Sequence, residues 1–237
     1  GVLAAHENLR RLEDYLQEQT QELVVAFVDL AGSTALKRRP QKEWLPSICR
    51  FLLHVSGVAE ANHGQVVKYI GDEVLAVFVD DGHGLATVHA EGFLWSCETG
   101  IESTCHDLAA KYCLDFGRGA WVRPEKGPLD ILGTCVDRCA RIAKLGKPGT
   151  AIASGQYVAK SRNPTSWARI GSFCFHGLAE EVAVHQLDGF GGKGLIDVSE
   201  ANAMGRDPLE AFREVVEANR QLAECQADLK RFLEEVQ

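Results

Sequence analysis

Hydrophobic residues follow two patterns along this chain, continuous runs and a helical spacing, and segments with the two patterns alternate. Continuous apolar runs, typical of buried strands, occupy residues 23–30, 66–70 and 74–79. Apolar residues spaced three and four apart predict helices between and around these runs. The helices are expected at 1–20, 42–64, 84–112 and 134–146, and Gly100 could interrupt the third. Shorter apolar runs predict further strands at 114–122, 150–154, 172–177 and 182–187.

The order of these elements predicts the fold class. Strand, helix, strand, strand, helix and strand follow one another, and a further helix and strands come after them. This order is typical of an α+β domain of ferredoxin-like kind, with an antiparallel-rich sheet and helices on one face. We expect residues 1–20 to form an N-terminal amphipathic helix and residues 21–190 to form the domain. Gly and polar residues indicate a linker at 191–207, and apolar heptads predict a coiled-coil helix at 208–237, for self-association or docking.

Composition narrows the class of protein. The 237 residues carry a net charge of -8 and the basic run at 36–40 is short, so charge-driven binding to nucleic acid is not expected. No apolar run approaches the roughly 20 residues of a membrane helix. The eight cysteines include no CxxC pair, and most lie in apolar patterns. Free thiols in a reducing, cytoplasmic compartment are therefore the expectation.

Two of the predicted strands lead into an aspartate. Asp29 lies in the run at 23–30, and Asp72 stands between the two runs that form a hairpin. A Gly-Asp pair favours tight turns, so a turn residue is one interpretation of Asp72. Carboxylates that converge from neighbouring strands also suit Mg²⁺, which prefers oxygen ligands, and two ions can serve one phosphoryl site.

The loop after Asp29 adds a second feature to this pattern. Gly32, Ser33 and Thr34 place backbone N–H groups near the start of a helix, which is a suitable cradle for phosphate. Together with the two aspartates, this loop favours chemistry on a phosphorylated substrate.

At these residues the sequence resembles the class III nucleotide cyclases. Their opening motif is similar to "FVDLAGST", their Lys-x-x-Gly-Asp motif to "KYIGD", and their third motif to "DILGTCVDRCAR". The closing pattern of Lys-Gly and a short strand is similar to "FHGLAEEVAVHQL". The four motifs occur in the family's order between residues 23 and 187.

The resemblance implies a metal-dependent reaction on an NTP. Asp29, Asp72 and the carbonyl of Leu30 would hold two Mg²⁺ or Mn²⁺ ions. The ribose 3′-hydroxyl would attack the α-phosphate in line and expel pyrophosphate. Positioning and charge neutralisation dominate such chemistry.

The resemblance also implies a head-to-tail homodimer whose active sites use residues of both chains. The partner would direct Lys68 and Asp130 toward the base and Arg141 toward the phosphates, where a guanidinium can meet two oxygens. The residues alone leave alternatives open. Lys68 could be the solvent-facing residue of an edge strand, Asp130 a turn residue, and Arg141 part of a surface ion pair.

Three positions depart from the family's pattern. Asp137 replaces the asparagine of the third motif, His176 replaces the closing lysine, and Tyr69 follows Lys68 where a small residue is usual. A tyrosine there could fill the space of a purine's second ring, although neighbouring residues of a regular strand point to opposite faces. Arg118 is either an extra donor to a pyrimidine carbonyl or a surface residue.

With these departures the chain resembles the bacterial pyrimidine cyclases of anti-phage defence, which make cyclic UMP or cyclic CMP to activate a separate effector protein. UTP is the favoured substrate and CTP the second. An adenylate cyclase is the alternative, because a lysine and an aspartate can also read adenine. A domain that binds nucleotide without turnover is a further alternative, favoured by Asp137 and His176.

Overall fold

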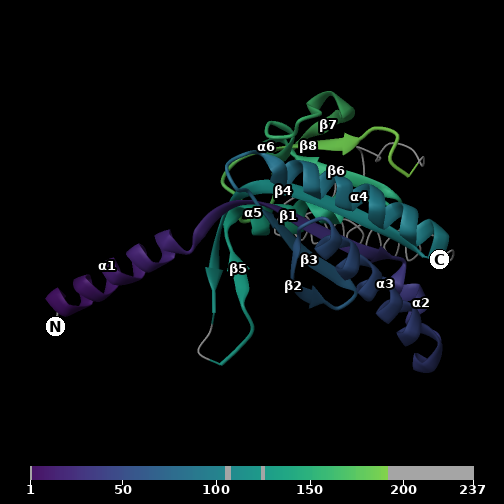
Figure 1. The fold of residues 1–237 in the computed structure, drawn as a ribbon, viewed down its shortest axis with the longest axis horizontal. Helices are drawn as coiled ribbons and strands as arrows, with labels where there is room; N and C mark the ends of the chain where they lie inside the picture. Colours follow the sequence, from purple (N-terminus) through teal and green to yellow (C-terminus); the bar gives the residue numbers. More distant parts are fainter. Residues whose placement is uncertain (1, 105–107, 124–125, 192–237) are drawn as a thin grey trace, which may run out of the picture.

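The computed structural model describes residues 2–104, 108–123 and 126–191. Its central unit has the predicted order of strands and helices (Figure 1). The elements of this unit are β1 (Thr20–Ala31), α3 (Gln41–Ala61), β2 (Gln65–Ile70), β3 (Glu73–Val79), α4 (Leu85–Thr104) and β4 (Ala109–Val122). β1 forms because residues 23–28 are an unbroken apolar run, and all six of these side chains are buried.

The strands of the central unit lie in the order β2-β3-β1-β4 and pair antiparallel. This is the strand order of the ferredoxin-like fold, so the predicted fold class is confirmed. The described sheet is longer, because β6 (Thr150–Ser154) adds in parallel to β4, and β8 (Val182–Leu187) and β7 (Trp167–Phe173) follow. The short strand β5 (Asp130–Leu132) pairs with the far end of β4.

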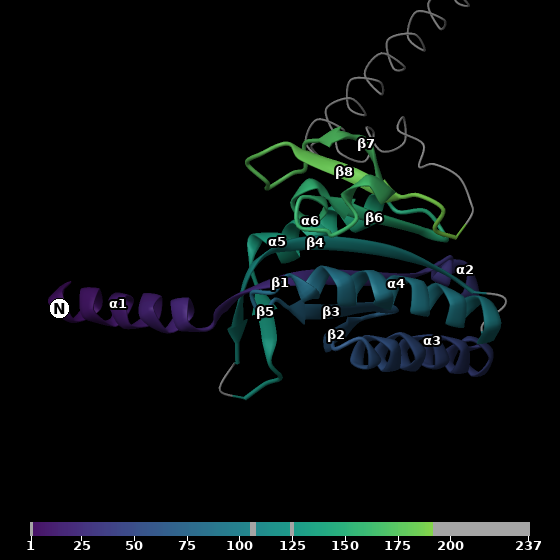
Figure 2. The same ribbon diagram turned by 45° about the horizontal axis from the view of Figure 1, so that its top comes forward.

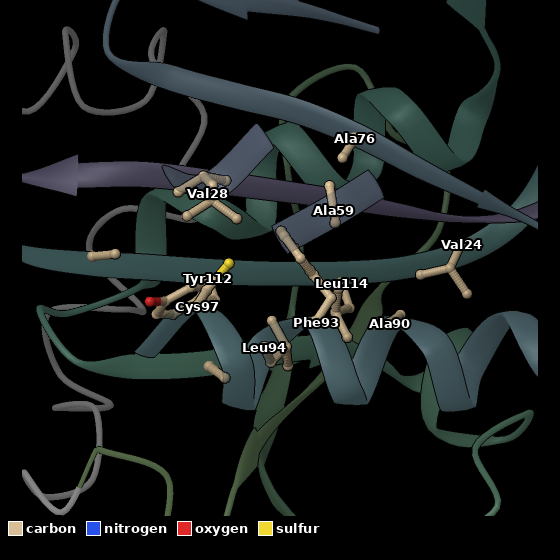
Figure 3. Close-up of a cluster of buried hydrophobic side chains, with 14 of the residues drawn as sticks. Val24, Val28, Ala59, Ala76, Ala90, Phe93, Leu94, Cys97, Tyr112 and Leu114 are labelled. Atoms are coloured by element: carbon tan, nitrogen blue, oxygen red, sulfur yellow. The ribbon is translucent and has the colours of Figure 1, made fainter. Parts of the chain in front are cut away.

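Helices α3 and α4 cover one face of this sheet, as Figure 2 shows. The core on this face joins alternate residues of the central strands, such as Val24 and Leu114, to apolar residues of the two helices, such as Phe51 and Phe93. Figure 3 shows part of this cluster. These four side chains are almost fully buried, and full burial of one such side chain stabilises the fold by about 1.5–3 kcal/mol.

The opposite face carries α5 (Thr134–Ile142), so the expectation that helices cover only one face is wrong. Cys135, Cys139 and Ile142 are spaced three and four residues apart and pack against Phe27 and Leu75 of the sheet. The same strands therefore bury both faces, which explains why their sequences read as continuous apolar runs. The 3-10 helix η1 (Ala143–Leu145) continues from α5.

Four elements lie outside these layers. The N-terminal helix α1 (Val2–Glu18) extends away from the domain in both views (Figures 1 and 2). The remaining three are short: α2 (Ser33–Leu36) after β1, α6 (Gly155–Val158) after β6, and the 3-10 helix η2 (Pro164–Ser166) before β7. None of the three was predicted, because segments this short carry no periodic signal.

Two sequence predictions need correction. The helix expected at 84–112 ends at Thr104 and passes through Gly100 without a break, and residues 109–112 belong to β4. Residues 174–177, expected to be strand, lie beyond the end of β7. The linker and the coiled-coil helix predicted from residue 192 onward fall outside the described residues.

Two other expectations concern the cysteines and the membrane. Six cysteines of the described part are free thiols, and four of them are buried: Cys97, Cys113, Cys135 and Cys139. In the same part of the chain, no helix combines the length and apolar character needed to cross a bilayer.

Candidate active site

Asp29 lies near the end of β1, where the buried run gives way to partly exposed positions. Antiparallel pairing sets it opposite Glu73 of β3 on one side and Lys111 of β4 on the other. The Lys111 Nζ lies 2.5 Å from Asp29 Oδ2. Leu30, whose carbonyl the family resemblance assigns to the metal, follows on the same strand with its side chain buried.

Asp72 forms the two-residue turn of the β2–β3 hairpin together with Gly71. Gly71 has φ = 70°, the positive value that a type II′ turn requires at its first central position. The Lys37 Nζ donates to Asp72 Oδ1 at 2.6 Å. Burial acts to raise the pKa of Asp72, but hydrogen bonds from Lys37 and Ser33 outweigh it and hold the pKa below its usual value. The turn interpretation and the ligand interpretation are therefore compatible.

Glu73 is a third carboxylate at this point, and the sequence analysis missed it. It follows Asp72 directly and pairs with Asp29 across the strands. Burial, reinforced by the negative charge of Asp29, raises the pKa of Glu73 to about 7. Its position directly after the Gly-Asp pair was the signal that could have identified it.

The carboxylates at the ends of β1 and of the β2–β3 hairpin offer hard oxygen donors to a divalent ion. The lysines paired with Asp29 and Asp72 indicate negative charge at this point, and the charge of Asp29 adds to burial in raising the pKa of Glu73. Among the described residues, no group of three or more His, Cys, Asp and Glu side chains forms a metal site. A site of two carboxylates and substrate phosphates suits Mg²⁺ or Mn²⁺, and Asp29 and Asp72 fit it.

The small-residue loop begins directly after β1. Gly32 has φ = 73°, and a Cβ added there would meet nothing within 4 Å. Ser33 and Thr34 begin α2, which is a helix of only four residues. The phosphate-binding role of Gly32, Ser33 and Thr34 stays a prediction.

The structure pairs the two residues that the resemblance assigns to the base. The Lys68 Nζ lies 2.6 Å from Asp130 Oδ2, and this ion pair joins β2 to β5. Both side chains are partly exposed, at 42% for Lys68 and 34% for Asp130. Slight burial acts to raise the pKa of Asp130, but the hydrogen bond from Lys68 prevails and lowers it. Their role in reading a base stays a prediction.

Tyr69 lies on the face of the sheet opposite to Lys68. Lys68 pairs with Leu75, which belongs to the α5-side core, and Tyr69 pairs with Val74, which belongs to the α3-side core. The Tyr69 hydroxyl lies 2.9 Å from the Ser56 hydroxyl of α3. Within one chain, this arrangement does not support the expectation that Tyr69 and Lys68 line one base pocket.

Arg118 lies on β4 opposite Glu22 of β1, with its side chain exposed. Within the described residues, its side chain makes no hydrogen bond or ion pair with the Lys68–Asp130 pair or with the carboxylates. Its proposed contact with a pyrimidine carbonyl stays a prediction.

Arg141 and the closing pattern lie close together. The Arg141 Nη2 would be 3.0 Å from a Cβ placed on Gly177, which has φ = 79° and follows His176. The Arg141 Nε is buried and has no hydrogen-bond partner within the described residues. Asp137 lies one helical turn before Arg141, on the exposed side of α5.

A buried network holds the helix that carries Asp137 and Arg141. The Arg138 Nε and Nη2 donate to the two carboxylate oxygens of Asp115 on β4, at 2.7 and 2.8 Å. The Ser154 hydroxyl of β6 also donates to Asp115, whose side chain is fully buried. The network fixes α5 against the sheet. Sequence analysis missed it because its residues come from three separate segments.

Comparison with solved structures identifies this architecture. The adenylyl cyclase CyaB from P. aeruginosa matches with a TM-score of 0.65 and 18% identity, over 71% of this chain and 94% of that structure. The chain has the fold of a class III nucleotide cyclase domain. A dimeric guanylyl cyclase domain from Blastocladiella emersonii also matches, with a TM-score of 0.59 and 17% identity, over 72% of this chain and 97% of that structure.

Sequence comparison gives shorter matches. An adenylate cyclase from Glutamicibacter nicotianae is 31% identical over 131 residues, which cover 54% of this chain and 29% of that relative. An uncharacterised protein, Rv1318c, from Mycobacterium tuberculosis is 28% identical over 155 residues, which cover 59% of this chain and 27% of that relative. The chain thus spans less than a third of the curated relatives it matches. No protein-family model matches it.

Proposed function

We propose that this domain is a nucleotide cyclase that converts an NTP to its 3′,5′-cyclic nucleotide and pyrophosphate. The observation that carries the proposal is the position of Asp29 and Asp72 in a cyclase fold. They lie at neighbouring strand ends, each in an ion pair with a lysine ammonium group and partly accessible to solvent. Carboxylates with replaceable partners suit metal binding better than carboxylates fixed in a core.

Two bound Mg²⁺ or Mn²⁺ ions would activate the attacking oxygen and stabilise the leaving group. The chain's own residues would bind and orient the nucleotide. Arg141 would neutralise phosphate charge with its guanidinium, and His176, in the turn beside it, would contribute a further donor. Asp137, a carboxylate near the phosphates, would have to accept from a hydroxyl or a base N–H.

The proposed active unit is a homodimer with shared sites. The carboxylates of one chain would face Lys68, Asp130 and Arg141 of its partner. The Lys68–Asp130 pair supports this assignment, because a lysine donor and a carboxylate acceptor are already positioned side by side and are partly exposed. A base that binds there would replace the ion pair with hydrogen bonds to both side chains.

For the base itself, we propose a pyrimidine, with UTP favoured over CTP. The support comes from the sequence resemblance to pyrimidine cyclases, since Lys68 and Asp130 can satisfy uracil, cytosine or adenine. ATP is the second candidate, and the relative named adenylate cyclase favours it. If the pyrimidine proposal holds, the product would activate a separate effector protein in anti-phage defence.

A panel of the four NTPs tests activity and base choice together. The purified full chain is incubated with ATP, GTP, UTP or CTP and Mn²⁺, and the products are separated by chromatography with mass detection. Cyclic UMP as the main product supports the proposal, and cyclic AMP as the main product supports the second candidate. Binding of an NTP without turnover, in a protein shown to be dimeric, would mean that the domain is a nucleotide-binding module.

A further inference from the structure

Both candidate metal-binding aspartates carry a lysine as their ion-pair partner. The Lys37 Nζ lies 2.6 Å from Asp72 Oδ1, and the Lys111 Nζ lies 2.5 Å from Asp29 Oδ2. These contacts are distinct from the Lys68–Asp130 pair, which joins β2 to β5. Each carboxylate that would bind a divalent ion is therefore already beside a monovalent cation.

The fold, not local sequence, brings these lysines to the site. Lys111 is directly opposite Asp29 in the β1–β4 pairing, so the strand register fixes its position. Lys37 is the C-cap residue of α2, 35 residues before Asp72 in the chain. Two different elements thus direct an ammonium group onto the same carboxylate cluster.

The carboxylate cluster needs such counter-charge. Glu73 experiences the negative charges of both Asp29 and Asp72, and the positive charge of Lys111 opposes them. Three carboxylates at adjoining positions repel one another when no cation is near. Lysine suits this task because its ammonium group is a compact charge on a flexible stem, which can withdraw without disturbing the backbone.

We propose that Lys37 and Lys111 are internal counter-cations that compete with divalent ions for Asp72 and Asp29. This inference rests on the proposed metal site. A divalent ion that approaches either aspartate is repelled by an ammonium group a few ångströms away, and it binds only as the lysine side chain moves aside. The lysines therefore lower the affinity of the nucleotide-free protein for metal. Partial exposure of Lys37, at 38%, gives it room to withdraw.

Mn²⁺ binding to the nucleotide-free full chain tests this inference without any measurement of turnover. The free Mn²⁺ signal in electron paramagnetic resonance gives the Kd for the wild type, Lys37→Met and Lys111→Met. Each variant should bind Mn²⁺ more tightly, on the order of tenfold, because a unit positive charge about 5 Å from the ion is removed. Methionine keeps the length of the aliphatic stem. Circular dichroism and thermal unfolding establish that each variant is folded.

Two controls locate the effect. Lys42→Met removes the same charge from an exposed position at the start of α3, and its Kd should stay within about twofold of the wild type. In the double variant Lys37→Met with Asp72→Asn, the gain in affinity should disappear. Persistence of the gain in this double variant would place the ion elsewhere and overturn the inference.

The remaining outcomes separate this inference from the proposed function. If the wild type binds Mn²⁺ and neither lysine variant binds it more tightly, the counter-cation role is wrong and the metal centre stands. If a lysine variant binds Mn²⁺ and the wild type does not, the competition is stronger than expected and the inference is supported. If none of these folded proteins binds Mn²⁺, the counter-cation role is wrong, whereas the proposed metal centre, which also uses substrate phosphates, is tested separately by turnover with the four NTPs.

Discussion

Asp115 and Asp72 both meet a basic side chain, but in opposite surroundings. Asp115 is fully buried, and Arg138 binds both of its oxygens through a planar guanidinium. Asp72 is partly exposed and receives a single ammonium group from Lys37. A buried bidentate pair is costly to open, because each charge would lose its counter-charge in the core. A partly exposed lysine pair exchanges with solvent or with another cation at little cost. Partner type and burial together separate the structural carboxylate, Asp115, from the proposed metal ligand, Asp72.

The largest effect is expected when the buried pair is broken. Arg138→Met leaves the Asp115 carboxylate in the core without its partner, which should lower the free energy of unfolding by about 3–5 kcal/mol. Urea denaturation followed by circular dichroism measures this loss. Arg50→Met, at an exposed position of α3, is the matched control and should change stability by less than about 0.5 kcal/mol. Equal effects of the two substitutions would contradict the contrast between the regions.

Loss of the partly exposed carboxylate Asp72 should affect activity and leave stability nearly unchanged. Asp72→Asn removes one ligand charge from the proposed two-ion site, so cyclase turnover should fall on the order of 100-fold or more while the fold is retained. Product formation at limiting Mn²⁺ measures the loss, and thermal unfolding checks the fold. Asp14→Asn on the exposed surface of α1 is the control. Turnover of Asp72→Asn equal to the wild type would rule out the proposed centre.

Mixing two inactive variants tests whether one site uses both chains. Asp72→Asn damages the carboxylate half of a site, and Arg141→Ala damages the phosphate half. Equal mixing should restore activity to about a quarter of the wild type, since half of the dimers are mixed and each has one intact site. Dilution below the dimer dissociation constant should reduce wild-type activity as well. Absence of rescue, with chain exchange demonstrated, would contradict the shared site.

Substitutions at Tyr69 and Lys68 test which face of β2 contacts the base. Its hydroxyl contacts Ser56 on the α3 side, so Tyr69→Thr should cost about 1 kcal/mol of stability and leave the ratio of kcat/KM among the four NTPs unchanged. Lys68→Met, on the other face, should alter that ratio. A rise in purine turnover for Tyr69→Thr would instead support the pocket role that the sequence suggested, in which tyrosine excludes the second ring of a purine.

The smallest effect concerns a partly buried histidine. Burial, together with the positive charge of Arg169, lowers the pKa of His185 below its ordinary value of 6.5. The unfolded chain therefore takes up this proton at a higher pH than the folded chain does. The contribution of His185 to stability should be complete above about pH 6.5 and decrease as the pH falls through the lowered pKa. Tm measured at pH 7.5 and 5.5 should show a smaller acid-induced decrease in His185→Gln than in the exposed control His83→Gln.

The sequence predicted the elements whose signals are local and continuous. The run at 23–28 and the Gly71–Asp72 turn gave β1 and the hairpin directly, and the ferredoxin-like order followed from them. Lys111 was missed because Ala109–Tyr112 carries no clear strand period and was joined to the preceding helix. Its pairing with Asp29 depends on a register that joins segments far apart in the chain.

The candidate site, like the fold, could be predicted only in part from the sequence. The family resemblance predicted Asp29, Asp72, Lys68 and Asp130 as site residues, and the structure pairs the last two. Helix α5 was expected, but its position on the second face of the sheet was not. An amphipathic pattern shows that a helix packs against the sheet, but it does not show which face the helix covers. The relation of Tyr69 to Lys68 needed the strand register.

The network of Asp115, Arg138 and Ser154 has a consequence for how sequences with this fold diverge. A substitution at Arg138 alone leaves a buried charge, and a substitution at Asp115 alone leaves a guanidinium without its acceptor. Replacement of both by apolar residues of similar volume can be neutral. We therefore expect positions 115 and 138 to covary among homologues, while Lys37 and Lys111 vary independently of each other.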